Sequence, residues 1–142
     1  MKSFAKPLTA NDTGETGGHQ AGILIPKGQP ELMEALPYLD PTIKNPDFWI
    51  TCIDEGGTEW SFRYVYYNNK LHDEKGTRNE YRITHMTKYF RSVVAKAGDV
   101  FIISVVKPGI IYNIKVQPAE EEIKTESDSP NRIRLKGWRR IH

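Results

Sequence analysis

Two polar segments hold most of the side chains in this chain that could recognise another molecule. One runs from Thr9 to Gln20 and the other from Asn68 to Arg82. Both are too polar to belong to a core, and both are rich in hydrogen-bonding side chains. Arg, Asn, Gln, Glu and Asp side chains end in groups that match the base edges exposed in the major groove of DNA. Two such segments on one small chain predict a clamp on double-stranded DNA.

The first segment combines glycines with mostly neutral donors and acceptors. Gly14, Gly17 and Gly18 allow positive backbone φ angles and a close approach to a nucleic-acid backbone. We define Asn11–Gln20 as the first arm. The side chains that we expect to contact DNA from this arm are Asn11, Asp12, Thr13, Thr16, His19 and Gln20.

The second segment ends in a stretch in which charged residues alternate. Arg78, Glu80 and Arg82 are two positions apart, so their side chains project from one face of an extended chain. An acid between two arginines would repel phosphate, so we interpret Glu80 as an acceptor for a cytosine amino group, with the arginines bonded to guanine. An ordinary cross-strand ion pair is the alternative. We define Lys70–Arg82 as the second arm, in which Asn79 is a further candidate for DNA contact.

Charge is distributed unevenly, although the net charge is only +2. Trp60–Lys96 holds eight bases and three acids, Pro118–Ser129 holds five acids and one base, and Asn131–His142 holds five bases and no acid. This segregation fits a surface that faces a polyanion, opposed by an acidic back. Solvated faces that cancel overall are the alternative. Lys6, Lys70 and Lys75 are placed to neutralise phosphates and release counterions.

The sequence offers little for catalysis. No Gly-Lys-Ser/Thr follows the glycines, so they do not form a Walker motif. His19, His72 and His85 are scattered, and Cys52 is the only cysteine, which excludes an internal disulfide and a four-cysteine zinc site. Cys52 lies in an apolar run, which predicts a buried, inert thiol. We therefore expect no catalytic residue, no metal and no cofactor in this chain.

The rest of the chain reads mostly as strands. At 142 residues it fits a single domain. Helices are predicted at Pro30–Leu36 and Met86–Ala97. The predicted strands are His19–Ile25, Phe48–Ile53, Trp60–Tyr67, Tyr81–Ile83, Asp99–Val106, Ile110–Val116 and Arg132–Ile141. The fold class is therefore mainly β with two short helices, an open antiparallel barrel of about seven strands.

The aromatic residues are expected to fill this barrel. Trp60, Phe62, Tyr64 and Tyr66 fall on one face of their strand, with Arg63 and Val65 on the other. The residues predicted as barrel filling are Trp49, Trp60, Phe62, Phe101 and Trp138.

No apolar run reaches the length needed to span a bilayer, and no secretory leader precedes Thr9, so we expect no membrane partner and a reducing, intracellular location.

The residues of the two arms also carry a resemblance. Thr9–Gln20, continued to Pro26, closely resembles the start of the N-terminal effector-binding domain of EcoRII-type restriction endonucleases. Tyr66–Asn68 and Gly76–Thr84 match a second stretch of that domain. The matches cover about a quarter of the chain, in the same order and at similar separation. The loop from Lys70 to Lys75 differs in length and sequence.

The resemblance implies a DNA-binding pseudobarrel, the fold shared with plant B3-like transcription factors. In that family two arms enter the major groove like a wrench, and the domain reads its site as a monomer. EcoRII-type domains read CC(A/T)GG, which implies a CC/GG-containing site here. In the family a Mg²⁺-dependent nuclease domain follows the reader. We therefore expect residues 1–142 to be the non-catalytic N-terminal domain of a larger restriction enzyme of the prokaryotic cytoplasm, with that nuclease domain outside this chain.

Other functions remain open from the sequence. A stand-alone transcription factor of the same fold would bind DNA in the same way. A complete small nuclease would need a metal-binding carboxylate cluster. A protein-interaction module that uses the aromatic strands would bind its partner without dependence on salt.

Overall fold

One curled sheet organises the part of the chain that the structure describes. The computed structural model describes residues 2–14, 22–118 and 137–142. Its eight strands follow the order β2-β5-β4-β3-β7-β6-β1-β8. All pairings are antiparallel except that of β3 with β7. The strands are β1 (Ser3–Pro7), β2 (Ile23–Ile25), β3 (Asp47–Ile53), β4 (Glu59–Tyr67), β5 (Glu80–Thr84), β6 (Val100–Lys107), β7 (Ile111–Gln117) and β8 (Arg139–Arg140).

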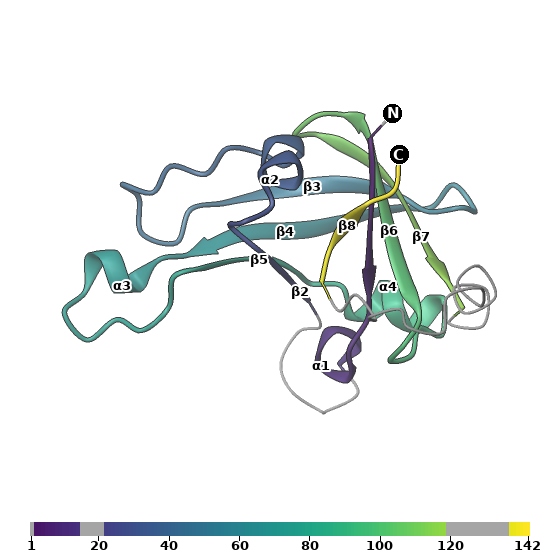
Figure 1. Cartoon of the computed structure of the whole chain (residues 1–142), viewed down its shortest axis with the longest axis horizontal. Coiled ribbons are helices and arrows are strands. Elements are labelled where there is room, and N and C mark those ends of the chain that lie inside the picture. The colour runs from purple at the N-terminus through teal and green to yellow at the C-terminus, as the bar shows by residue number, and fades with distance from the viewer. Residues whose placement is uncertain (1, 15–21, 119–136) are drawn as a thin grey trace, which may run out of the picture.

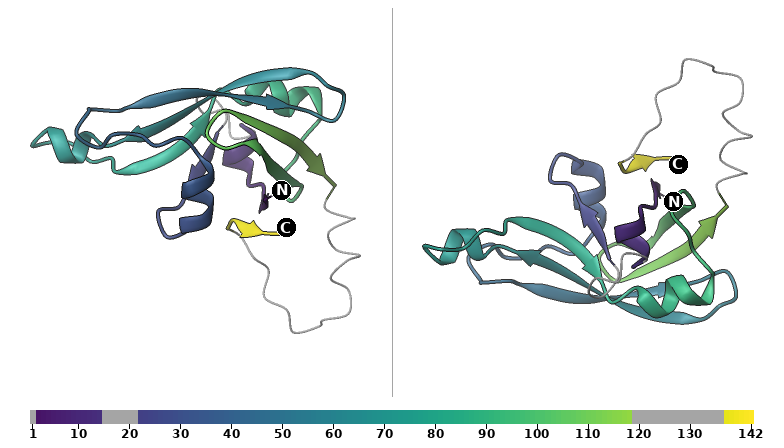
Figure 2. Two further views of the ribbon diagram at one scale, coloured as in Figure 1. Left: turned by 90° about the horizontal axis from the view of Figure 1, so that it is seen from above. Right: turned by 90° about the horizontal axis from the view of Figure 1, so that it is seen from below.

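The sheet curls into a barrel that stays open between its edge strands, β2 and β8 (Figures 1 and 2). Trp138, just before β8, spans this opening, because its indole Nε1 donates to the Leu24 carbonyl of β2 at 2.9 Å. Its ring meets Phe101 edge-on, with 6.2 Å between ring centroids. Gln29 Nε2 donates to the Trp138 carbonyl at 3.1 Å. The predicted mainly β, open barrel is confirmed, with eight strands in place of seven.

β1 is the strand that the sequence prediction missed. It lies between β6 and β8 in the sheet, and both of its faces are covered. Phe4 belongs to the main core, whereas Ala5 packs with Val100 and Ile102 in a smaller cluster. A short strand that is buried on both faces lacks the alternation of apolar and polar residues by which strands are usually recognised.

Within the described residues four short helices connect the strands: α1 (Ala10–Thr13), α2 (Pro30–Ala35), α3 (Asn69–His72) and α4 (Thr87–Ser92). The helix predicted at Pro30–Leu36 is confirmed as α2. The prediction of a helix to Ala97 was wrong, because α4 ends at Ser92 and Val94 adopts a left-handed φ of 53°. Beyond Phe90 the helix has no apolar face to bury, since Val93 and Val94 are exposed. None of the helices in the described ranges is both long and apolar enough to cross a membrane.

The barrel interior confirms the predicted alternation of β4. Phe62, Tyr64 and Tyr66 are buried, and Trp60 packs against the same core. Cys52 is buried, and its burial raises the pKa of the thiol to about 12, as expected of an inert side chain.

Phe101 and Trp138 also fill the barrel, but the prediction for Trp49 was wrong. Its side chain is 49% exposed, because Ile50 and Cys52 occupy the inward positions of β3. Trp49 instead faces outward beside Arg63, its partner on β4.

Part of the predicted organisation falls on residues that the structure does not describe. Of the strand predicted at Arg132–Ile141, residues 132–136 lie outside the described residues, and β8 occupies Arg139–Arg140 of the remainder. His19–Ala21 at the start of another predicted strand, and the acidic stretch from residue 119 to 129, lie outside the described residues.

Candidate nucleic-acid interface

The pairing of β2 with β5 brings the roots of the two arms together. β2 follows the first arm, and β5 contains the end of the second arm. Ile23 pairs with Ile83 and Leu24 with Arg82. Just before β2, Gly22 lies so close to β5 that a Cβ atom on it would be 2.4 Å from the Ile83 carbonyl oxygen. The two arms therefore leave the sheet from neighbouring strands.

We call the contacts of Lys6, Thr9 and Asp12 at the start of α1 the first-arm root, and Asp12 is its central residue. Its backbone N–H donates to Thr9 Oγ1 at 3.1 Å, and its carboxylate accepts from the Thr9 backbone N–H at 3.0 Å. This reciprocal capping box starts α1. The Lys6 ammonium of β1 donates to the same carboxylate at 2.5 Å, and both side chains are only 9% exposed. α1 then ends at Gly14, whose φ is 83°.

This geometry departs from the expected roles of Lys6 and Asp12. The Lys6 ammonium also donates to the Pro7 carbonyl at 3.1 Å, so it faces the protein and not a phosphate. Asp12 Oδ2 accepts from both Lys6 and Thr9, and its side chain is buried. Both residues therefore lie within the arm root, where they attach α1 to β1.

The other expected residues of the first arm divide into two groups. Asn11 is exposed, and Thr13 is half-buried with its Oγ1 donating to the Ala10 carbonyl at 3.2 Å. The remaining three, Thr16, His19 and Gln20, lie outside the described residues.

Hydrogen bonds between Asn69, Lys70 and Arg78 join the two ends of the loop of the second arm. The Lys70 backbone N–H donates to the Arg78 carbonyl at 3.0 Å, and the Arg78 N–H donates to Asn69 Oδ1 at 2.8 Å. Gly76 fits inside this loop, where a Cβ atom would lie 2.1 Å from the Asn69 carbonyl oxygen. Lys70 and Lys75 are exposed on the loop. Of the three lysines expected to meet phosphate, these two have the exposure that the role requires.

The buried Asn68, just before the second arm, forms hydrogen bonds that fix the start of the arm. The Asn68 side-chain amide donates to the carbonyls of Pro41 and Ile43 at 3.2 and 2.8 Å. Its Oδ1 accepts from the Asn45 backbone N–H at 2.7 Å, and Asn45 Oδ1 accepts in return from the Asn68 N–H at 3.1 Å. The loop before β3 thus holds the arm where β4 ends.

Arg78, two residues before β5, forms a continuous charged row with Glu80 and Arg82 of that strand. Arg78 Nε donates to Glu80 Oε1 at 3.1 Å, and Arg82 Nε donates to Glu80 Oε2 at 2.8 Å. The Arg78 guanidinium lies over the ring of Tyr67, 3.7 Å from its centroid. The alternative for Glu80 was an ion pair across two strands. The ion pairs instead join residues of the same segment of chain. We call these three residues the β5 row.

The β5 row keeps Glu80 ionised. Partial burial acts to raise the pKa of the carboxyl, but hydrogen bonds and charges from Arg82 and Arg78 outweigh it and hold the pKa below its ordinary value. A lowered pKa in the folded state means that these ion pairs persist as the pH falls through the usual range for Glu and are lost only below it. At neutral pH the row therefore carries a net charge of +1 with fixed geometry.

Asn79 lies on the opposite side of the strand from the row, and its side chain already has partners. Its Oδ1 accepts from the Tyr66 hydroxyl at 2.5 Å and also from the Lys27 ammonium. The Tyr66 ring stacks on Tyr81 with 4.1 Å between centroids. Asn79 thus joins the second arm to the turn that follows β2, a contact that adds to the β2–β5 pairing.

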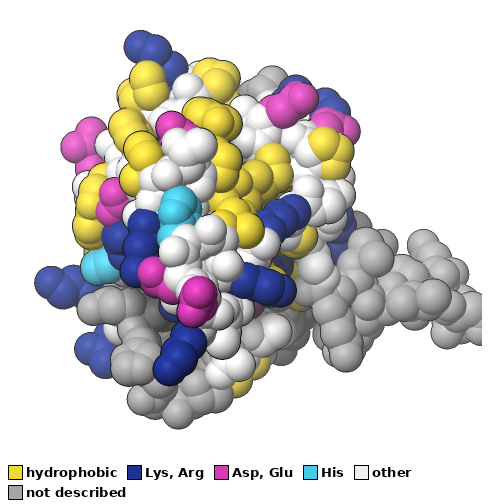
Figure 3. Space-filling view, turned by 90° about the vertical axis from the view of Figure 1, so that its left-hand side faces the viewer, with side chains coloured by type: hydrophobic (Ala, Val, Ile, Leu, Met, Phe, Trp, Pro, Cys, Tyr) yellow, Lys and Arg dark blue, Asp and Glu magenta, His cyan; other side chains and the backbone are white. Residues whose placement is uncertain are grey.

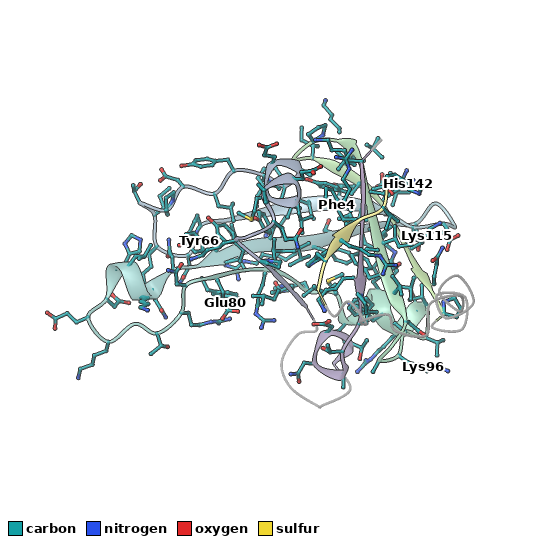
Figure 4. All side chains as sticks on the ribbon, viewed as in Figure 1. Phe4, Tyr66, Glu80, Lys96, Lys115 and His142 are labelled. Atoms are coloured by element: carbon teal, nitrogen blue, oxygen red, sulfur yellow. The ribbon has the colours of Figure 1, made fainter. Side chains whose placement is uncertain are left out.

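The β5 row forms the last part of the second arm, and its Glu80 lies between α3 and α1 in the view of Figure 4. Figure 4 places Glu80 on the lower side of the sheet, with α3 of the second arm to its left and α1 of the first arm to its right. Figure 3 views the molecule from the α3 end, where Lys and Arg side chains gather around a small acidic group. Arg78, Glu80 and Arg82 are half-buried, with side chains 41%, 28% and 36% exposed.

Sequence reasoning missed Lys27 and Tyr67. Tyr67 lies opposite Glu80 in the β4–β5 ladder and so supports Arg78. Recognition of β4 and β5 as partners, in register across the second arm, would have revealed it. Lys27 carries no local signal, because it meets Asn79 only through the pairing of β2 with β5. Within the described residues no group of three or more His, Cys, Asp and Glu side chains is arranged to hold a metal ion.

Lys6→Met should destabilise the protein in the absence of any ligand, because Asp12 would keep a buried charge without its partner. We expect the free energy of unfolding to fall by roughly 3 kcal/mol, measured by urea denaturation with tryptophan fluorescence. Lys70→Met, at an exposed lysine, is the matched control and should change it by no more than about 0.5 kcal/mol. Equal effects of the two substitutions would contradict the place of Lys6 in the arm root.

Comparisons with known proteins agree with this geometry. The family model "Restriction endonuclease EcoRII, N-terminal" matches residues 1–117. The Type II restriction enzyme EcoRII of Escherichia coli is 42% identical over 84 residues, which are 57% of this chain and 20% of that enzyme. This chain therefore spans about a fifth of the length of that relative.

Two solved structures share the fold. The Arabidopsis FUS3–DNA complex has a TM-score of 0.61 at 22% identity, over 84% of this chain and 99% of that one. The B3 domain of the UbaLAI restriction endonuclease with cognate DNA has a TM-score of 0.54 at 20% identity, over 99% of this chain and 87% of that one. With the family match over most of its length, the chain belongs to the family of EcoRII N-terminal domains.

Proposed function

We propose that this chain binds double-stranded DNA sequence-specifically, as a monomer, with both arms in the major groove of a short CC(A/T)GG-like site. The observation that carries the proposal is the β2–β5 pairing, which sets both arms beside one accessible row of Arg78, Glu80 and Arg82. Each arm would take one half of the site. No two-fold symmetry of the protein is then required.

The chemistry of the β5 row supports a site rich in G·C pairs. Arg pairs with the O6 and N7 acceptors of guanine, and Glu accepts from the cytosine amino group. Both arginines contact Glu80 through Nε, so these bonds leave their terminal amino groups for guanine. Each oxygen of a carboxylate offers two acceptor sites, and one on each oxygen of Glu80 remains for cytosine.

The spacing of the row supports the same site. Alternate residues of a strand lie about 7 Å apart. Two base-pair steps of B-DNA span about 6.8 Å. A strand laid along the groove would thus present successive members of the row to bases two steps apart.

The family membership supports a place in a restriction enzyme. Because the E. coli relative is a Type II restriction enzyme of which this chain spans a fifth, we assign DNA recognition to this domain and Mg²⁺-dependent cleavage to a separate nuclease domain. Both structural neighbours are complexes with DNA, which supports DNA as the ligand.

Replacing arginines of the row should separate specific from general binding. Arg78→Ala or Arg82→Ala should weaken binding to a CC(A/T)GG duplex by about 1–3 kcal/mol, with far less effect on a scrambled duplex. Fluorescence anisotropy with labelled duplexes measures both. Lys75→Ala is the control, because loss of a phosphate contact should weaken both duplexes equally and lower the salt slope by about one. Equal losses on both duplexes from the arginine substitutions would exclude base recognition by the row.

Substitutions of Glu80 test its part in the row. Glu80→Ala removes a negative charge, so phosphate attraction alone predicts tighter binding to every duplex. Base recognition predicts weaker binding to the CC(A/T)GG duplex, because the cytosine amino group loses its acceptor and the two arginines lose their common partner. Glu80→Gln keeps one acceptor oxygen and should fall between wild type and Glu80→Ala. If Glu80→Ala tightens binding to both duplexes by the same factor, Glu80 has only a structural ion-pair role.

A further inference from the structure

The corner between α4 and β6 lies directly beside the root of the first arm. The Gly98 backbone N–H donates to the Leu8 carbonyl at 2.8 Å, and the Leu8 N–H donates to the Asp99 carbonyl at 2.7 Å. Leu8 immediately precedes the capping box of α1, so the first arm begins beside this corner, and the chain meets β5 at Gly22. Figure 1 shows α3, α1 and α4 in succession along the lower side of the molecule.

Three exposed bases occupy this corner. Lys88 and Arg91 lie one turn apart on α4, whose Tyr89 and Phe90 are buried in the core, and both basic side chains are exposed. Lys96 follows the helix and is also exposed, on the lower side of the molecule in Figure 4. We call Lys88, Arg91 and Lys96 the α4 surface.

The bases of the α4 surface differ from those nearer the arms in how they are used. Lys6, Arg78 and Arg82 each form an ion pair with a described acid. Among the described residues, no acidic side chain lies within salt-bridge distance of Lys88, Arg91 or Lys96. The Asp99 carboxylate, the acid at this corner, accepts from the Lys96 backbone N–H at 3.0 Å. The three cations keep their capacity for an external anion.

We propose that the α4 surface binds the phosphates of DNA that flanks the recognition site on the side of the first arm. The proposal rests on the proposed function and extends it, because it gives the interface a third part that reads no bases. Lys and Arg on an exposed surface attract phosphate in any sequence, and each contact releases counterions. The domain would then cover a longer stretch of duplex than the arms alone reach.

The test compares two triple variants that remove equal charge. One is Lys88→Gln/Arg91→Gln/Lys96→Gln. The control is Lys2→Gln/Lys107→Gln/Lys115→Gln. Lys2 precedes β1 and Lys107 ends β6, so both lie at the far ends of these two strands from the first-arm root. Lys115 lies on β7, away from the arms in Figure 4. Equal unfolding midpoints in urea would show that neither variant disturbs the fold.

Affinity for a CC(A/T)GG duplex is measured by fluorescence anisotropy between 50 and 200 mM salt. Affinity should fall over this range for both proteins. Because the α4 variant lacks two or three phosphate contacts, its fall in affinity should be smaller than that of wild type by a factor of roughly 10 to 40. The control variant should follow wild type closely. Extending the duplex by about one helical turn on the first-arm side should tighten binding by wild type and leave the α4 variant unchanged.

The outcomes separate this inference from the proposed function. The α4 surface would be overturned if the α4 variant bound DNA with the affinity and salt dependence of wild type and gained as much from the longer duplex. That result would leave DNA recognition by the arms intact. Failure of wild type to distinguish the CC(A/T)GG duplex from a scrambled one would overturn the proposed function.

Discussion

The antiparallel ladder between β2 and β5 joins two segments that are far apart in the sequence, and both arms depend on it. Backbone hydrogen bonds between Ile23–Ile25 and Tyr81–Ile83 fix the direction in which each arm leaves the sheet. The approach is so close at Gly22 that any side chain there would meet the Ile83 carbonyl. Lys27 and Asn79 add a side-chain contact across the same junction. A shift of this ladder by one residue would turn Arg82 from the outer face into the core.

Charge serves two different purposes on either side of this ladder. The Lys6–Asp12 pair is almost fully buried and holds α1 against β1, so its loss would be felt mainly in stability. The β5 row is more accessible, with side chains 28% to 41% exposed. Accessible ion pairs contribute only about 0–1 kcal/mol to folding. The main consequence of the β5 row is therefore the fixed orientation of two guanidinium groups, on which the proposed base recognition depends.

The sequence predicted the features that depend on local pattern. The alternation of Phe62, Tyr64 and Tyr66 identified the inner face of β4, and alternate charges identified the outer face of β5. The sequence did not predict features that depend on pairing between residues far apart in the chain. β1 is buried on both faces and carries no alternation of apolar and polar residues. Trp49 has the residue type of a core position, but Ile50 and Cys52 occupy the inward positions of β3.

The roles of individual polar residues were the hardest to predict. The side chains of Lys6 and Asp12 suit a nucleic-acid surface, yet the capping box of α1 holds Asp12 in the arm root and Lys6 forms an ion pair with it there. The partners of Asn79 come from β4 and from the turn after β2, and neither is near it in the sequence. Residue type and spacing therefore predicted two polar arms, whereas the tertiary contacts decide which of their described side chains face outward.

The central claim is that one duplex contacts both arms at once across the β2–β5 junction. The most direct test is to titrate isotope-labelled protein with a CC(A/T)GG duplex and to follow the backbone amide signals by NMR. We expect the amides of Gly22–Ile25 and Arg78–Thr84 to shift together, at the same ratio of DNA to protein, while those of Val105–Ile110 at the opposite end of the sheet stay unchanged. Shifts confined to one arm, or centred on the β6–β7 turn, would contradict the account.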